Sequence, residues 1–214
     1  MVQPMLSATS IATSHDELTR AWHVDPQPID HTILPATNSD CTDLAANWLE
    51  RVARQHRANF DLWHIEDEAR TPGATDAMVA NVKRRIDRTN QIRNDLTEDL
   101  DRTLVEWLAS KDLPDPSAPL NSESPGLMID RLSILALKIY HTCQETERPG
   151  ASEGHILRNR GRLDILELQR ADLAGCLDAL WQETLAGTRS FKLYRQMKMY
   201  NDPSLNPAIY RSRQ

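Results

Sequence analysis

The chain of 214 residues is long enough for one substantial hydrophobic core and short for two independent domains. Its composition, with 40% hydrophobic, 26% charged and 5% aromatic residues, excludes disordered, collagen-like and membrane-embedded classes. The formal net charge of -6 gives no general reason to expect an anionic partner, so nucleic acid is disfavoured.

No sequence signal directs the chain into a membrane or out of the cell. The segment 1–18 lacks a basic start followed by an apolar run, which is the pattern of a secretory signal. The most apolar stretch, 127–140, contains three charged residues and is too short to span a bilayer. Three cysteines without CxxC spacing indicate reduced packing residues. We therefore expect a cytoplasmic location and no membrane insertion.

Prolines divide the chain into stretches that show helical periodicity, and no stretch alternates as a strand does. Ser14 and Glu17 have the spacing of a capping box, which predicts a short first helix from Ser14 to about His23. A proline-bearing arm follows it. Four long helices are then predicted over about 39–70, 75–111, 124–148 and 152–187. The 124–148 helix is apolar nearly all round, so we expect it to be the central buried helix.

The predicted fold class is all-α: an elongated antiparallel bundle of about five helices, four of them long. We expect the short helix and arm over 1–38, the bundle over 39–188, and a basic aromatic tail over 189–214 that packs on the bundle. This tail has six Lys/Arg and one Asp, with four aromatic residues among them. Such a segment suits docking on the acidic body or on a partner, and also nucleic acid.

Polar residues interrupt the apolar stripes of three helices. At about 100° per residue, the stripe of the 39–70 helix continues through Glu66 and Arg70, which should point inward. Buried charges need partners or a ligand, and arginines and amides suit phosphate or sugar recognition. An internal network that fixes the register of the helices is the structural alternative. The predicted ligand-binding residues are Arg70, Asn90, Arg93, Asn94, Asp130, Arg131 and Lys138.

His64, Glu66 and Asp67 are the candidates for acid–base catalysis, because nearby carboxylates can orient an imidazole or raise its pKa. An exposed or network histidine is the alternative reading of His64. The other six histidines have no ligand spacing, and the chain has no HExxH, Gly-rich phosphate loop or nucleophile elbow. The sequence thus predicts no metal site, and it leaves open the cofactor and whether the protein is an enzyme.

Four segments resemble a family of bacterial all-helical proteins classed as a domain of unknown function. They are 58–70, 86–101, 124–141 and 194–207. The resemblance implies an all-helical bacterial protein, loosely associated with gene neighbourhoods for surface glycans. It transfers no reaction and no catalytic residue. The first three segments coincide with the polar interruptions, which favours a site there.

Two functions are compatible with these patterns. The first is a helical bundle whose interior polar site binds a small anionic ligand of phosphate or glycosyl-phosphate type, in cell-envelope glycan metabolism, with or without catalysis. The alternative is a non-enzymatic interaction or scaffold protein whose interior charges are structural. Its basic tail would dock a partner, or a second copy in a homo-oligomer. An open cluster of Glu66, Arg93 and Arg131 would favour the ligand, and a closed network the alternative.

Overall fold

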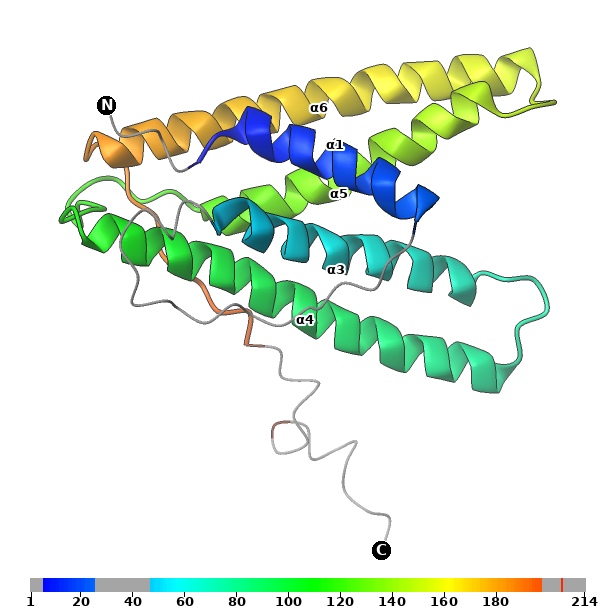
Figure 1. Ribbon diagram of the computed structural model, residues 1–214, viewed down its shortest axis with the longest axis horizontal. Coiled ribbons are helices and arrows are strands. Elements are labelled where there is room, and N and C mark those ends of the chain that lie inside the picture. The colour runs from blue at the N-terminus through cyan, green and yellow to red at the C-terminus, as the bar shows by residue number, and fades with distance from the viewer. Residues whose placement is uncertain (1–5, 26–46, 198–204, 206–214) are drawn as a thin grey trace, which may run out of the picture.

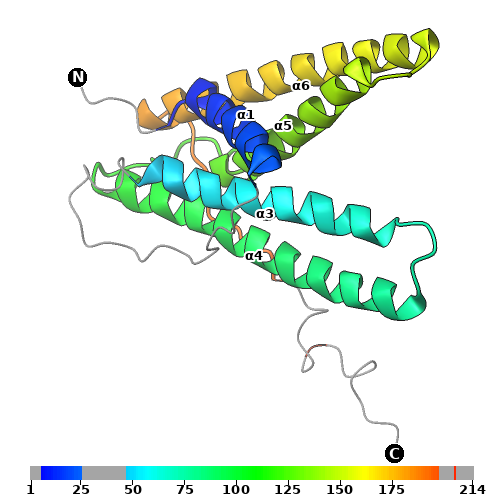
Figure 2. The ribbon, with the colours of Figure 1, turned by 45° about the vertical axis from the view of Figure 1, so that its right-hand side comes forward.

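Five helices form the part of the chain that the computed structural model describes, which is 6–25, 47–197 and 205. They are α1 (Ala8–Val24), α3 (Trp48–Ala69), α4 (Asp76–Ala109), α5 (Pro125–Glu147) and α6 (Glu153–Leu185). Helices α3 and α4 form one antiparallel hairpin, and α5 and α6 form another (Figure 1). The two hairpins diverge toward their turns (Figure 2). Within the described ranges there is no strand, only an isolated bridge between Leu120 and Ser190. The predicted all-α antiparallel bundle is confirmed.

The ends of the last three helices follow local sequence signals. The side chains of Thr75, Ser124 and Ser152 accept hydrogen bonds from backbone N–H groups in the first turns of α4, α5 and α6. Pro125 occupies the first position of α5, where no helical N–H is needed. Because these caps act locally, the predicted ranges agree with the structure within the usual scatter of helix ends.

The first helix differs from its predicted range. It begins at Ala8 instead of Ser14, because Ser7 caps it by accepting a hydrogen bond from the Ser10 N–H at 3.4 Å. The Ser14–Glu17 pair therefore lies inside the helix. The predicted proline-bearing arm and the predicted start of the next helix near residue 39 lie outside the described residues.

The main hydrophobic core lies at the end of the bundle where the two hairpins approach each other. Helix α5 packs against α1, α3, α4 and α6, which confirms that it is the central helix. Helix α1 contributes to the same core and packs on α3, α5 and α6 (Figure 1). The fully buried core side chains include Ile11, Trp48, Leu100, Leu104, Leu132, Leu177 and Trp181.

A smaller core cluster lies farther along the bundle, between α1, α3 and α5. It consists of Trp22, Phe60 and Leu137, with Leu18 and Trp63 packed against it. This second cluster positions the end of α1 against the middle of the bundle, where the polar interruptions occur.

The first residues of the predicted tail pack on the bundle. Phe191 is buried in the main core, and the Gln196 N–H donates to Glu98 Oε1 at 2.8 Å. The part of the tail from 198 onward lies outside the described residues, apart from Leu205. Among the described helices, none is both long enough and apolar enough to span a membrane.

Candidate functional site

The carboxylate of Asp130 is the centre of the polar interior. Its Oδ1 accepts hydrogen bonds from Gln55 Nε2 at 2.6 Å, Asn59 Nδ2 at 2.9 Å and Arg93 Nε at 2.8 Å. Its Oδ2 accepts a further bond from Arg93 Nη2 at 2.5 Å. The side chain of Asp130 is buried, so these donors replace the water that its charge requires. This part of the interior is therefore a closed network instead of an open pocket.

The network continues through two more buried side chains. Ser133 Oγ accepts from Asn59 Nδ2 at 2.9 Å and lies 2.7 Å from His56 Nδ1. The other ring nitrogen of His56 lies 2.9 Å from Thr19 Oγ1. A serine beside a histidine can be a nucleophile and its base, but both side chains here are 0% exposed. No substrate could reach them, so we assign them a structural role.

The structure brings together some of the predicted ligand-binding residues. Arg93 and Asp130 pair directly, and Asn90 accepts a bond from Arg93 Nη1 at 3.4 Å. Asn94 lies on the same helix and is buried. Arg93, Asp130 and Asn90 thus belong to one network, whereas Asn94 Nδ2 is buried without a hydrogen-bond partner among the described residues.

Two arginines lie elsewhere than predicted. Arg70 does not point into the core and Glu66 is only partly buried, because the buried positions of α3 end at Ile65. Arg70 is 67% exposed and pairs with Glu66 at 3.1 Å and with Asp67 at 3.4 Å on its own helix. Arg131 is exposed and pairs with Glu123 at 2.8 Å. Of the predicted catalytic residues, Asp67 therefore lies at the surface with Arg70, whereas Glu66 is partly buried and its charge also acts on Arg93.

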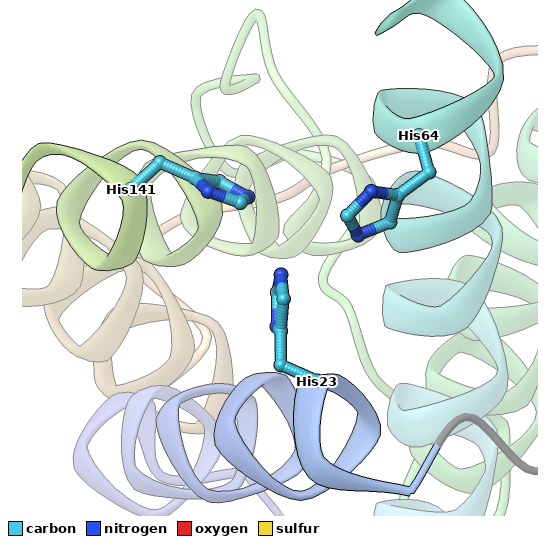
Figure 3. Close-up of side chains that lie close together, drawn as sticks. All are labelled: His23, His64 and His141. Carbon is cyan, nitrogen blue, oxygen red and sulfur yellow. The ribbon is translucent and has the colours of Figure 1, made fainter. Parts of the chain in front are cut away.

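Three histidines from three helices converge at one point. They are His23 of α1, His64 of α3 and His141 of α5, and their rings are directed toward a common centre (Figure 3). One ring nitrogen from each lies within 4.8 Å of the others. The ring centroids are 5.1 Å apart for His23 and His64, 5.0 Å for His23 and His141, and 6.0 Å for His64 and His141. We call this group the three-histidine cluster.

Aromatic rings hold the three-histidine cluster in place. His23 stacks on Tyr140 at 4.3 Å, and His141 stacks on Trp63 at 4.8 Å with an interplanar angle of 7°. Burial, followed by the charge of His23, lowers the pKa of His64 and of His141 below the usual 6.5.

A cleft of about 530 Å³ lies beside the three-histidine cluster, and we call it the α5–α6 cleft. His141 and Trp63 belong to its wall, so the cluster and the cleft are adjacent. A second cleft of about 650 Å³ shares Lys138 and Gln169 with it and includes Arg131. The residues that line the α5–α6 cleft are Trp63, Lys138, His141, Thr142, Glu145, Asn159, Arg162, Ile165, Leu166 and Gln169.

In the α5–α6 cleft the acidic side chain has oppositely charged partners, whereas the two basic side chains have no acidic partner among the described residues. Glu145 is engaged by His155 Nε2 at 2.8 Å and by Arg148 at 3.2 Å. Arg162 donates to Asn159 Oδ1 at 3.1 Å, which is a neutral acceptor. Lys138 forms no ion pair within the described part of the chain. The cleft therefore offers positive charge to an incoming group.

Sequence reasoning selected His64 and Lys138 but missed His23, His141 and Arg162. No local signal marks the missed residues, because the cluster is assembled by the packing of α1 against α3 and α5. A histidine without a ligand partner nearby in the sequence carries no metal-site pattern.

A family model described as "Protein of unknown function (DUF4254)" matches residues 49–193. This range includes His64, His141 and the whole α5–α6 cleft, whereas His23 on α1 lies before it. Searches of curated proteins and of solved structures found no match. Since the match covers most of the chain, the protein belongs to the DUF4254 family, a domain of unknown function.

Proposed function

We propose that the protein binds a small anionic ligand in the α5–α6 cleft. The ligand class is the one expected from the sequence, but the site moves from the interior to this cleft. The observation that carries the proposal is Lys138, a cation on the cleft wall without an ion pair among the described residues. The interior arginine, Arg93, already neutralises Asp130 and is not available to a ligand.

The shape and the lining of the α5–α6 cleft support this proposal. A volume of about 530 Å³ lies within the range of small-molecule sites. Lys138 and Arg162 supply charge, and the amides of Asn159 and Gln169 supply hydrogen bonds. Trp63 adds an aromatic wall. The combination suits a phosphate or carboxylate attached to a sugar or an apolar group.

The resemblance described above associates the family with surface-glycan genes, so we propose sugar-containing anions as the first ligands to test. Glycosyl phosphates and nucleotide sugars combine an anionic group with a hydroxylated ring, which matches the charges and amides of the cleft. Of the predicted catalytic residues, only His64 lies in the three-histidine cluster next to the cleft, while Glu66 and Asp67 pair with Arg70 at the surface. We therefore propose binding as the function and assign no reaction.

The test is ligand-induced stabilisation of the purified chain. We expect at least one of inorganic phosphate, a panel of sugar phosphates and a panel of nucleotide sugars to raise the melting temperature, because a ligand that binds only the folded state stabilises it. Lys138→Ala should weaken that binding by about tenfold or more, as expected when a charge-assisted bond is lost. Lys83→Ala is the control, because Lys83 is an exposed lysine of α4 that pairs with Asp87. Equal behaviour of the two variants, or no shift with any probe, would refute the proposal.

A second candidate function is self-association through α6. Leu157, Ile165 and Leu168 are exposed apolar side chains on one side of this helix. Exposed apolar side chains that share a face can mark a protein–protein surface. This observation favours the homo-oligomer expected under the interaction alternative. Light scattering of the wild type and of Leu168→Glu tests it: a dimer that dissociates in the variant supports the function, and a monomeric wild type refutes it.

A further inference from the structure

We propose that His23, His64 and His141 bind a divalent transition-metal ion of the zinc class. This inference goes beyond ligand binding in the α5–α6 cleft, and it replaces the expectation from sequence that the chain has no metal site. It rests first on convergence: three imidazoles from three separate helices place one nitrogen each within 4.8 Å of the others (Figure 3).

The spacing of the rings fits a tetrahedral ion. Zinc binds histidine nitrogens at about 2.0–2.1 Å, which puts the centroids of two bound imidazoles about 5 Å apart. His23 already lies at this spacing from its two partners, at 5.1 and 5.0 Å. The third pair, at 6.0 Å, has to close by about 1 Å, and the ring nitrogens, which lie within 4.8 Å of one another, have to approach to about 3.3 Å. His64 is only partly buried, so its side chain has room for this adjustment.

The second observation is the state of the ring nitrogens. His23 Nδ1–H donates to the Thr19 carbonyl oxygen at 2.7 Å, so Nε2 is the nitrogen that is left to bind a metal ion. A backbone carbonyl in this position is how metal-binding histidines are commonly held in one tautomer. The Nε2 atoms of His23 and His141 are both buried and have no hydrogen-bond partner among the described residues.

Ring packing alone accounts for only part of this arrangement. The stacking of His23 on Tyr140 and of His141 on Trp63 explains the positions of the rings. It leaves the Nε2 atoms of His23 and His141 without partners, like both ring nitrogens of His15, but among the described residues only the three-histidine cluster brings ring nitrogens of three helices together. A metal ion at the centre of the cluster would satisfy both atoms at once.

The ligand set selects the kind of ion. Three neutral imidazoles suit zinc, copper, nickel or cobalt, whereas magnesium and calcium require oxygen ligands. Three protein ligands leave a fourth position for water or for an anionic ligand.

Metal titration of the full chain without an affinity tag tests the site. After treatment with a chelator, we expect zinc to bind with one ion per chain in calorimetry, and cobalt to give the strong visible absorption of a four-coordinate site. His23→Asn, His64→Asn and His141→Asn should each weaken zinc binding by about 100-fold or more, because each removes a ligand. His155→Asn is the matched control, since His155 pairs with Glu145 outside the cluster.

Loss of zinc binding supports the site only in a variant that still folds, so folding is measured separately. Circular dichroism and the melting temperature of each metal-free variant show whether it folds. All three histidines are partly buried, and His64→Asn is read first because neither ring nitrogen of His64 is buried without a partner. Zinc should raise the melting temperature of the wild type and of His155→Asn but not that of folded His64→Asn. Absence of stoichiometric zinc binding, or zinc binding unchanged in folded His64→Asn, would overturn the proposal. Phosphate-ligand binding measured with chelator present, in wild type and Lys138→Ala, tests the α5–α6 cleft independently.

Discussion

Arg93 of α4 and Asp130 of α5 form an ion pair with two parallel hydrogen bonds, Nε to Oδ1 at 2.8 Å and Nη2 to Oδ2 at 2.5 Å. The planar guanidinium matches the carboxylate, so the pair fixes the orientation of the two helices as well as their charges. Hydrogen bonding and the charge of Asp130 raise the pKa of Arg93, consistent with a permanently ionised pair. This contact joins the second hairpin to the first in the polar middle of the bundle.

Removal of Asp130 should be strongly destabilising. In Asp130→Ala, Arg93 loses its counter-ion, the Gln55 amide loses its acceptor and the Asn59 amide loses one of two, so we expect the free energy of unfolding to fall by about 3–5 kcal/mol. The neighbouring Arg131→Ala breaks only an exposed pair and should cost about 1 kcal/mol or less. Urea unfolding measures both, and similar losses in the two variants would argue against a closed interior network.

Two glycines should respond to alanine in opposite directions. A Cβ on Gly126 would lie 2.6 Å from the Thr97 carbonyl oxygen and 2.8 Å from the side chain of Asp101, so Gly126→Ala should cost about 1–3 kcal/mol. Gly161 lies inside α6 with nothing within 4 Å of the added atom. Gly161→Ala should therefore stabilise the protein by about 0.5–1 kcal/mol. Thermal unfolding of the two variants compares them, and an unaffected Gly126→Ala would show that α4 and α5 are less closely packed at this point.

Asp101 should make the protein less stable as the pH rises from about 4 to about 6. Burial raises the pKa of this carboxyl from 3.8 to about 6, although hydrogen bonds from Ser124 and from the Gly126 N–H oppose the shift. Between these two values the folded state binds more protons than the unfolded state, so its advantage is complete below pH 4 and is lost above pH 6. Asp101→Asn removes this titration. Urea unfolding at pH 4 and pH 7 should therefore show the variant gaining stability relative to wild type at the higher pH, and a constant difference would contradict the assignment.

His15 should make the protein more stable as the pH rises, which is opposite to the effect of Asp101. Burial lowers its pKa well below 6.5, aided by the charges of His56 and Arg170, and both its ring nitrogens are buried without partners among the described residues. The stability that depends on neutral His15 is complete above pH 6.5 and is lost as the pH falls, because the unfolded state takes up the proton first. We expect His15→Leu to raise the free energy of unfolding by about 1 kcal/mol at pH 7 and by more at pH 5. Chemical denaturation at the two pH values measures this, and a variant less stable than wild type at both would contradict it.

His56, like His15, should make the protein less stable as the pH falls. Its pKa falls to about 3, mainly through burial, while its nitrogens contact Thr19 and Ser133. Because the two histidines and Asp101 act in opposite directions between pH 4 and pH 6, the pH profile of the wild type alone does not separate them. Single-site variants compared with wild type at each pH do.

The helices themselves could be read from the sequence because their signals are local. Ser124 followed by Pro125 marks the start of α5, and the same kind of cap marks α4 and α6. The first helix was predicted to start too late because the Ser14–Glu17 spacing resembles a cap, whereas the working cap is Ser7. When two candidate caps have similar local signals, the residues that the bundle buries determine where the helix begins.

Whether a polar side chain points inward depends on how the helices pack against one another, which the periodicity of one helix does not show. Arg93 of α4 and Asp130 of α5 did point inward, because the two side chains face each other and pair. Arg70 did not, because the buried positions of α3 end at Ile65 and the last turn meets α4 through the exposed Glu68–Arg85 pair. Angular position along a helix predicts a face, but only the arrangement of the neighbouring helices determines whether that face is covered.

The amino-acid sequence thus determined an all-α bundle, the range of its last three helices and the presence of polar residues in its middle, since periodicity and capping are properties of neighbouring residues. Tertiary structure decided which of those charges neutralise each other and which face the α5–α6 cleft. It also brought His23, His64 and His141 together, because contacts between distant segments arise only when the helices pack.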